Sequence, residues 1–466
     1  MKKRKAFYQL EKWLKDNHQS VAIVLGIRRV GKSTVLKQFA EAHNGYYVNF
    51  KETPMTTNEY EELFDRPEQL LCFDEIGYVQ DYDMVYRDVH TELEGRRLVI
   101  TGSSYGALSQ LGIEHLGCRS DKIEMFPLSF EEYLYFSGRI GEYGENYTPT
   151  DSDIQDFYRL KDVPEGMQIT LNAGYFGEVS DEMQISAKNL FCDTRHKVLS
   201  KDLAKAVYNV LAYTLNRHVN TKSFGETVPG KQEYTAKTLR KLGIDLSSSL
   251  IGQSNALSTE LSPKEIAQAL NFLLANGYAF VDLKKNTDEK QKIDLAHVLL
   301  AEVDSAESLD RVLKEYTLSV ISPLVYTRLM INIEDIVGIL CSNPALYGEL
   351  YELAVKSEEI YRRGYEKIHY SYKFVDTEIG EVDLMTCSDI TKPPLFLEAT
   401  ITHKRTTDCS VNQVFRDREA YRILTDLPGV SREAGNGTLY RLGYPEVLLM
   451  LSSDKEFDIP LMKGVQ

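Results

Sequence analysis

The amino-acid sequence predicts an α/β fold whose first third holds a buried parallel β-sheet with helices on both faces. Two observations lead to this prediction. Short apolar runs of strand length alternate with helical stretches, and strands covered on both faces have this composition. A glycine-containing segment with a lysine and a serine lies between the first apolar run and the first long helical stretch, as in phosphate-binding strand–loop–helix units.

The strands expected in this sheet are four short apolar runs in the first 101 residues. They cover residues 21–25 (VAIVL), 46–50 (YYVNF), 70–73 (LLCF) and 98–101 (LVIT). A helix is expected over residues 33–43, directly after the glycine-containing segment.

Residues 26–33 read GIRRVGKS and fit the pattern GxxxxGK[ST] at every position. Glycines let the backbone curl so that its N–H groups face phosphate oxygens. Lys32 is expected to reach the β- and γ-phosphates, and the Ser33 hydroxyl to ligate Mg²⁺. The residues expected to hold ATP are Gly26, Arg28, Arg29, Val30, Gly31, Lys32, Ser33 and Thr34.

A pair of acids ends the third apolar run. Asp74 is expected to hold Mg²⁺, largely through water, and Glu75 to orient and polarise the water that attacks the nucleotide. The alternative is that Asp74 and Glu75 merely end a strand at the surface, which the phosphate loop upstream disfavours. The sequence thus predicts a P-loop nucleotide hydrolase that uses ATP and Mg²⁺.

Two further residues are candidates for this site. Ser103 follows the fourth apolar run, where a hydroxyl could sense the γ-phosphate; the alternative is an ordinary strand-to-helix turn. Arg119 could reach the γ-phosphate of a neighbouring subunit as an arginine finger, which would require a homo-oligomer; the alternative is a surface arginine.

The composition excludes several classes of protein. The chain has 466 residues and a formal net charge of −15, which suggests about three domains and excludes a protein that is basic overall. No run approaches the roughly 18 apolar residues that span a bilayer, and no apolar signal core follows the basic start. The six cysteines show no CxxC spacing. These observations predict free thiols and a cytoplasmic protein without membrane contact.

The middle of the chain is expected to begin with a polar linker over residues 136–153, followed by a mostly helical stretch to about residue 217. Ser262-Pro263-Lys264-Glu265 forms a helix start signal, Gly277 a stop, and residues 278–283 a strand. This order fits a winged helix. Its basic residues predict contact with DNA phosphates, although such modules also dock proteins; they are Lys237, Arg240, Lys241, Lys284 and Lys285.

The last part of the chain mixes helices and strands. A helix is expected over residues 346–361 and a hairpin over 370–375 and 381–385, turning near Gly380. Residues 395–401 (LFLEATI) predict a central strand, and residues 446–451 (EVLLML) predict another strand.

Six motifs come in order along the N-terminal third: GIRRVGKS, YVNF, LLCFDEIGYV, VITGSS, GCR and FPLSFEEY. Together they resemble a prokaryotic branch of AAA+-type ATPases, close to the archaeal ATPase and STAND group, over residues 4–134. The segment NAGYFGE (172–178) resembles the lid turn of that branch, with Gly177 where proline is usual.

The resemblance implies a P-loop NTPase parallel sheet with a helical lid, a winged helix and an α/β restriction-endonuclease-like C-terminal domain of the PD-(D/E)xK type. The corresponding boundaries are 1–135 for the ATPase core, 136–217 for the linker and lid, 218–290 for the winged helix and 291–466 for the nuclease-like domain.

A PD-(D/E)xK nuclease needs two carboxylates to hold a divalent metal and a lysine to activate water. By the resemblance, Asp383 and Glu398 are the metal ligands of a possible second metal site, and Glu352 suits the place of an extra acid. Thr400 stands where the lysine belongs. The alternative, a degenerate structural domain in which the acids are remnants, is therefore favoured over an active nuclease.

Three hypotheses for the function remain. The first is an ATPase that acts on or with DNA. The second is a STAND-like nucleotide-gated switch or defence component with slow turnover. The third is an ATP-coupled, metal-dependent nuclease. The intact Asp74-Glu75 pair favours turnover over pure nucleotide holding.

Overall fold

The structure is a computed structural model of the chain. It divides into two compact units: of the described residues, the first holds those up to Pro127 and the short stretch Ala275–Gly277, and the second holds the rest from Leu128 onward. The described residues are 2–16, 19–27, 29–79, 93, 95–102, 120–164, 263–275, 277–283, 305, 308, 316–324, 344–363, 371–376, 380–386, 395–397, 422–425, 429–434, 437–441 and 444–453.

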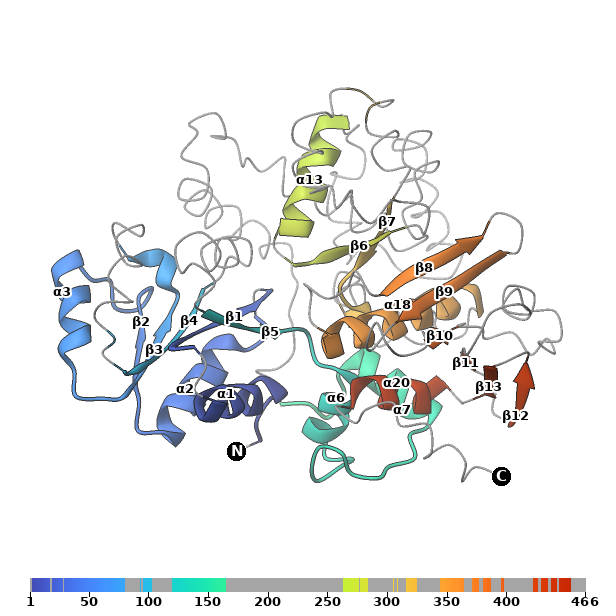
Figure 1. Ribbon diagram of the computed structural model, residues 1–466, viewed down its shortest axis with the longest axis horizontal. Helices are drawn as coiled ribbons and strands as arrows, with labels where there is room; N and C mark the ends of the chain where they lie inside the picture. Colours follow the sequence, from blue (N-terminus) through green and yellow to red (C-terminus); the bar gives the residue numbers. More distant parts are fainter. Residues whose placement is uncertain are drawn as a thin grey trace. The chain divides into compact units, whose positions relative to one another are not determined.

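The first unit is built on a parallel sheet, which has five strands in the described part of the chain (Figure 1). Its order is β2-β3-β4-β1-β5, and every neighbouring pair runs parallel. The strands are β1 (Val21–Gly26), β2 (Tyr46–Asn49), β3 (Leu70–Asp74), β4 (Arg97–Thr101) and β5 (Ser120–Met125). The four predicted strands are thus confirmed. The fifth was not predicted, because its sequence SDKIEM begins with three polar residues and holds only two apolar ones.

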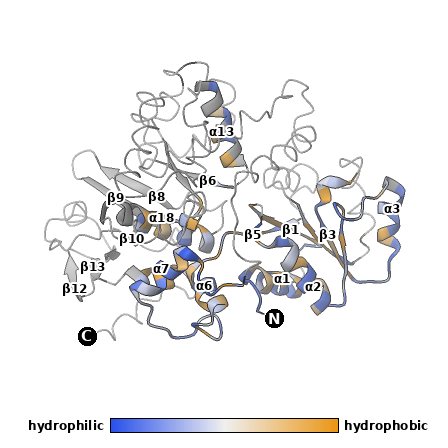
Figure 2. Ribbon diagram, turned by 180° about the vertical axis from the view of Figure 1, so that it is seen from behind, coloured by the Kyte–Doolittle hydropathy of each residue, from blue (hydrophilic) through white to orange (hydrophobic). Residues whose placement is uncertain are grey.

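Burial explains why these runs form the centre of the sheet. All residues of β1 and β3 are buried, as expected for strands covered on both faces. Helix α2 (Lys32–Ala42) packs on the sheet, and α1 (Lys5–Asp16) packs on α2 and β5. The ring of Phe7 from α1 meets that of Phe39 from α2 edge to face, 5.7 Å between centroids. Figure 2 shows hydrophobic and hydrophilic residues together on both helices, as on helices with one buried face.

Short helical turns connect the strands of the first unit. After β2, helix α3 (Thr57–Glu61) begins with a capping box between Thr56 and Glu59 and leads into the 3₁₀ turn η1 (Glu62–Asp65). The 3₁₀ turn η2 (Ile76–Tyr78) follows β3.

The second unit begins with two helices, α6 (Phe130–Ser137) and α7 (Asp151–Arg159), that pack on each other and on the C-terminal helix α20 (Tyr444–Ser452). Helix α20 also packs on the long helix α18 (Pro344–Arg363). The predicted helix over 346–361 is confirmed. The predicted strand over 446–451 is wrong. A short apolar run cannot be assigned by periodicity alone, and the buried residues Val447, Leu448 and Leu451 form one helical face against α18 and α6.

Residues far away in the sequence bind the start of α6. The first three N–H groups of a helix have no partner within the helix. Here the Phe130 N–H donates to Glu358 Oε1 at 2.7 Å, the Glu131 N–H to Ser452 Oγ at 3.1 Å, and the Glu132 N–H to Ser129 Oγ at 3.2 Å. The carboxylate of Glu358 also lies where the helix dipole favours negative charge. Two of these three bonds therefore tie α6 to the C-terminal part of the chain.

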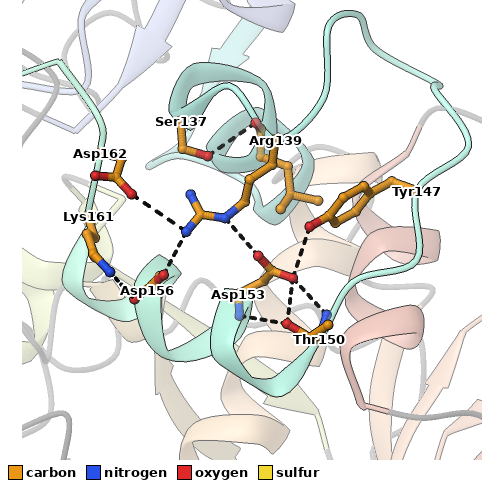
Figure 3. Close-up of polar contacts among 9 residues, drawn as sticks. Ser137, Arg139, Tyr147, Thr150, Asp153, Asp156, Lys161 and Asp162 are labelled. Carbon is orange, nitrogen blue, oxygen red and sulfur yellow. Dashed lines mark hydrogen bonds and ion pairs between the residues drawn. The ribbon is translucent and has the colours of Figure 1, made fainter.

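A cluster of ions joins α6 to α7 (Figure 3). The guanidinium of Arg139 points toward the carboxylates of Asp153 and Asp156, with N–O distances of 2.7 Å to each, and Asp162 lies 3.7 Å away. Asp153 also accepts bonds from the Thr150 backbone N–H and hydroxyl and from Tyr147. Burial by itself would raise the pKa of Asp153, but the bonds from Thr150, Arg139 and Tyr147 lower it below its ordinary value.

Replacing Arg139 with methionine is expected to lower the free energy of unfolding of the second unit by about 3 kcal/mol at pH 7. The change leaves the buried Asp153 without its cation and leaves Asp156 only the exposed Lys161. A depressed Asp pKa contributes stability above the unfolded value of about 3.9 that is lost as pH falls through the folded pKa. The difference between wild type and variant should therefore shrink below about pH 4. Urea unfolding at pH 7 and pH 3 measures it.

The matched control for this prediction is Lys161→Met. Lys161 pairs with Asp156 at 3.5 Å but is 56% exposed, so its loss should cost less than about 1 kcal/mol. Equal losses for the two variants would contradict the assigned role of Arg139.

The remaining elements form two smaller sheets. A pair of antiparallel strands, β6 (Ala279–Leu283) and β7 (Tyr316–Val320), follows helix α13 (Pro263–Ala275). The predicted stop at Gly277 is confirmed: its φ is 73°, and the Tyr278 N–H donates to Leu273 O at 2.8 Å.

A mixed sheet, six-stranded within the described residues, has the order β12-β13-β11-β10-β9-β8 (Figure 1). The predicted hairpin is confirmed as antiparallel β8 and β9, and the predicted central strand as the short β10 between β9 and β11. Among the described helices, none is both long and apolar enough to span a membrane. The strands are β8 (Ser371–Asp376), β9 (Gly380–Thr386), β10 (Leu395–Leu397), β11 (Arg422–Thr425), β12 (Gly429–Ala434) and β13 (Gly437–Arg441).

Candidate active site

The glycine-containing loop leaves the carboxyl end of β1, with β4 on one side of that strand and β5 on the other. Gly26 ends β1 with φ 156°, and a Cβ atom at this position would lie 2.2 Å from Met125 O. No larger residue fits beside the backbone of β5. Gly26 is therefore required where the loop begins.

Helix α2 begins at Lys32, directly after the loop. Its N-cap is Gly31 in the left-handed region, with φ 98°, and no side chain caps the helix. The N–H groups of the first helical turn are thus not bonded by a capping side chain, and an uncapped helix start binds anions such as phosphate.

The side chain of Lys32 folds back into the loop. Its Nζ donates to Gly26 O at 2.8 Å and to Ile27 O at 3.1 Å, and the residue is only 7% exposed. An ammonium group carries three hydrogens. The two carbonyl bonds therefore fix a positive charge inside the phosphate-binding loop.

Asp74 and Glu75 lie at the carboxyl end of β3, on the same edge of the sheet as the loop, with β4 between β3 and β1. Asp74 is 1% exposed, and its Oδ2 accepts hydrogen bonds from Tyr47 Oη at 2.7 Å and Asn49 Nδ2 at 3.1 Å. The carboxylate is buried but hydrogen-bonded, as a buried charge must be.

The backbone of Glu75 is strained. This residue has φ 54° and ψ 46°, in the left-handed region, which costs roughly 1–2 kcal/mol for a residue with a Cβ. Its carbonyl accepts the Tyr78 N–H at 3.0 Å, which begins η2. Strain of this kind gathers at functional sites.

Arg4 supports the loop from outside and was not predicted from the sequence. Its guanidinium donates to Val30 O at 2.7 Å and to Phe126 O at 2.8 Å, and the residue is buried. Arg4 thus ties the loop to the end of β5. Tyr47 and Asn49 were also missed as site residues. Their alternation in YYVNF places them on one face of a strand, and this is the signal that could have identified them.

The structure brings most of the predicted nucleotide-binding residues to one edge of the sheet. Gly26 ends β1, Arg29 to Gly31 form the loop, and Lys32 to Thr34 start α2. The buried lysine, the uncapped helix start and the nearby acids fit the phosphates of a nucleotide and a Mg²⁺ ion. Four predicted residues lie outside the described part of the chain: Arg28, Ser103, Arg119 and Glu398.

The predicted acids of the C-terminal domain are described only in part. Asp383 lies in β9. Glu352 lies in α18, where its Oε1 accepts a hydrogen bond from the buried Lys356 Nζ at 2.9 Å. Thr400, His403 and Lys404 fall outside the described residues, as do Lys237, Arg240, Lys241, Lys284 and Lys285.

Residues 18–134 match the family model of the AAA domain. Over 127 residues the chain is 31% identical to the uncharacterized protein MJ1544 of Methanocaldococcus jannaschii. The aligned segment covers 25% of this chain and 28% of that protein. It is 24% identical over 150 residues to MJ1637 of the same organism, covering 28% of this chain and 31% of that protein. The chain thus spans less than a third of the length of the curated relatives it matches.

Several solved structures are similar to this chain at low scores. The Walker-type ATPase PABY2304 of Pyrococcus abyssi aligns with a TM-score of 0.34 and 14% identity, covering 70% of this chain and 95% of that one. The Aeropyrum pernix ORC1 protein in complex with DNA aligns with a TM-score of 0.26 and 12% identity, covering 74% and 93%.

The parallel sheet, the GIRRVGKS loop and the family match agree. Residues 18–134 thus carry a P-loop α/β sheet and are similar to the AAA domain.

Proposed function

We propose that this protein is a Mg²⁺-dependent ATPase whose hydrolysis of ATP is coupled to association with DNA. The observation that carries the proposal is the arrangement of one sheet edge. A phosphate loop leaves β1, and an acid pair ends β3 on the same edge. Ligands of open α/β sheets bind outside the carboxyl ends of the strands.

Each residue of this edge has a role in the proposal. The loop backbone and Lys32 would hold the phosphates, and the Ser33 hydroxyl and Asp74 would hold Mg²⁺. Mg²⁺, when bound, neutralises charge that develops on phosphate oxygens. Glu75 would accept a hydrogen bond from the attacking water and polarise it. Ser103 would sense the γ-phosphate, and Arg119 would act across an interface between two copies of the chain.

The coupling to DNA rests on the basic residues predicted for the winged helix, and on the order of helix α13 and strand β6 in that segment. Lysines at the tip of such a unit would contact phosphates without reading sequence. The acidic chain as a whole would repel DNA, so binding would require this local positive charge.

Double-stranded DNA is expected to raise the steady-state rate of ATP hydrolysis by about three-fold or more at low salt. The stimulation should fall steeply between about 50 and 200 mM salt, because it depends on phosphate contacts. The measurement is phosphate release with and without DNA at several salt concentrations. The double variant Lys284→Ala, Lys285→Ala should lose the stimulation. A rate that DNA leaves unchanged at every salt concentration would exclude the coupling.

The runner-up is a nucleotide-gated switch that holds ATP and turns over slowly. The strained, acid-ended turn at Glu75 favours turnover, since a holding site needs no general base. The same assay separates the two: tight retention of ATP with negligible phosphate release would favour the switch.

A metal-dependent nuclease is a second candidate for the C-terminal part. Asp383 lies in β9, which pairs antiparallel with β10, and the resemblance makes Asp383 and Glu398 the metal ligands. Thr400 stands where the lysine belongs, which disfavours cutting. Cutting of DNA with Mg²⁺ or Mn²⁺ that is lost in Asp383→Ala would support this activity.

A further inference from the structure

Two side chains of β2 hold the buried acid of β3. Asn49 is the register partner of Asp74 in the parallel pairing of these strands, and Tyr47 lies two residues earlier on the same face. Both donate to the same oxygen, Asp74 Oδ2. Hydrogen bonds to an ionised acceptor are stronger than neutral ones.

The amide of Asn49 is itself fixed. Its Oδ1 accepts the backbone N–H groups of Lys51 at 2.9 Å and Glu52 at 3.2 Å. An asparagine side chain that accepts a hydrogen bond from the backbone N–H two residues later forms an Asx-turn. The other end of the amide, Nδ2, is thereby directed toward Asp74.

The hydroxyl of Tyr47 donates to Asp74 Oδ2 at 2.7 Å. Among the described residues, no donor contacts Asp74 Oδ1, so the two bonds on Oδ2 hold one carboxylate oxygen and leave the other without a donor from these residues.

We infer that Tyr47 is a positioning residue for the divalent cation of the nucleotide site: together with Asn49 it holds Asp74 Oδ2, so that Oδ1 meets the water shell of Mg²⁺. The inference rests on the proposed function, because it assumes that Asp74 serves the Mg²⁺ that accompanies ATP. Mg²⁺ demands near-ideal octahedral geometry and keeps several waters. A carboxylate that can rotate would satisfy this geometry less often than a fixed one.

A role limited to strand pairing would have different consequences. Losing a bond that only joins β2 to β3 would lower stability and would weaken nucleotide binding equally with and without Mg²⁺. A positioning role affects only the Mg²⁺-dependent part of binding. The test therefore compares binding of a fluorescent ATP analogue in Mg²⁺ and in EDTA.

Tyr47→Phe removes the donor and keeps the ring. We expect the gain in affinity that Mg²⁺ provides to fall by about three- to ten-fold, as for loss of one hydrogen bond to a charged group, while affinity in EDTA stays within about two-fold. The matched control is Tyr46→Phe on the opposite face of β2, where the ring packs under Arg66 at 3.7 Å. Asn49→Ala is a second variant and should shift the Mg²⁺ dependence in the same direction.

A double-mutant cycle ties the effect to Asp74. In an Asp74→Asn background, Tyr47→Phe should cause no further change, because its partner is already altered. An unchanged Mg²⁺ dependence in Tyr47→Phe, beside a wild type that responds to Mg²⁺, would overturn the inference and leave the proposed function intact. A wild type that binds no nucleotide in either condition would overturn the proposed function itself.

Discussion

Replacing Lys32 with alanine is expected to weaken ATP binding by about 100-fold or more, because charge-assisted hydrogen bonds are each worth roughly 1.5–3 kcal/mol. The ammonium group is fixed inside the loop by the carbonyls of Gly26 and Ile27. No other described side chain places a cation on these carbonyls. Titration calorimetry with ATP and Mg²⁺ measures the loss.

The control is Lys12→Ala, which removes an exposed lysine from α1. Lys12→Ala changes the net charge by the same amount as Lys32→Ala but leaves the phosphate loop unaltered. Thermal unfolding of both variants separates lost binding from lost folding, since Lys32 is buried. Equal ATP affinities for Lys32→Ala and wild type would show that the loop does not hold phosphate.

Glu75→Gln is expected to lower the rate of ATP hydrolysis by about 100-fold or more, the range that general-base catalysis contributes. ATP affinity should stay within about three-fold of wild type, because glutamine keeps the length of the side chain and the left-handed backbone at this position. Phosphate release and equilibrium binding on the same preparation measure both quantities.

Glu41→Gln serves as the matched control, since Glu41 is exposed on α2. Its rate of hydrolysis should equal that of the wild type. If the Glu75→Gln variant still hydrolyses ATP at the wild-type rate, Glu75 is not the catalytic base.

Much of the first unit could be predicted from the sequence because its signals are local. The strands β1 and β3 are short apolar runs buried on both faces, and the loop between β1 and α2 has a fixed spacing. The edge strand β5 escaped prediction because four of its six residues are polar and none of its apolar residues adjoin. Helix α20 was mistaken for a strand because its run of five apolar residues, 447–451, shows no period of its own.

The contacts that complete the site could not be predicted, because each joins distant parts of the chain. Arg4 reaches Phe126, 122 residues away, and Tyr47 reaches Asp74, 27 residues away. In the second unit, Glu358 meets the start of α6 across 228 residues. Alternation in YYVNF shows which residues share a face, but the neighbouring strand follows only from the sheet order.

The most direct test of the account is the number of phosphates that each chain releases from ATP in Mg²⁺. Purified protein is mixed with excess ATP, and phosphate is followed over time beside Glu75→Gln. The account predicts many phosphates per wild-type chain and fewer than one per Glu75→Gln chain over the same period, with ATP bound to both. If each wild-type chain releases no more than one phosphate and retains ATP, the result would contradict the proposed ATPase activity. The nucleotide-gated switch would then be the better account.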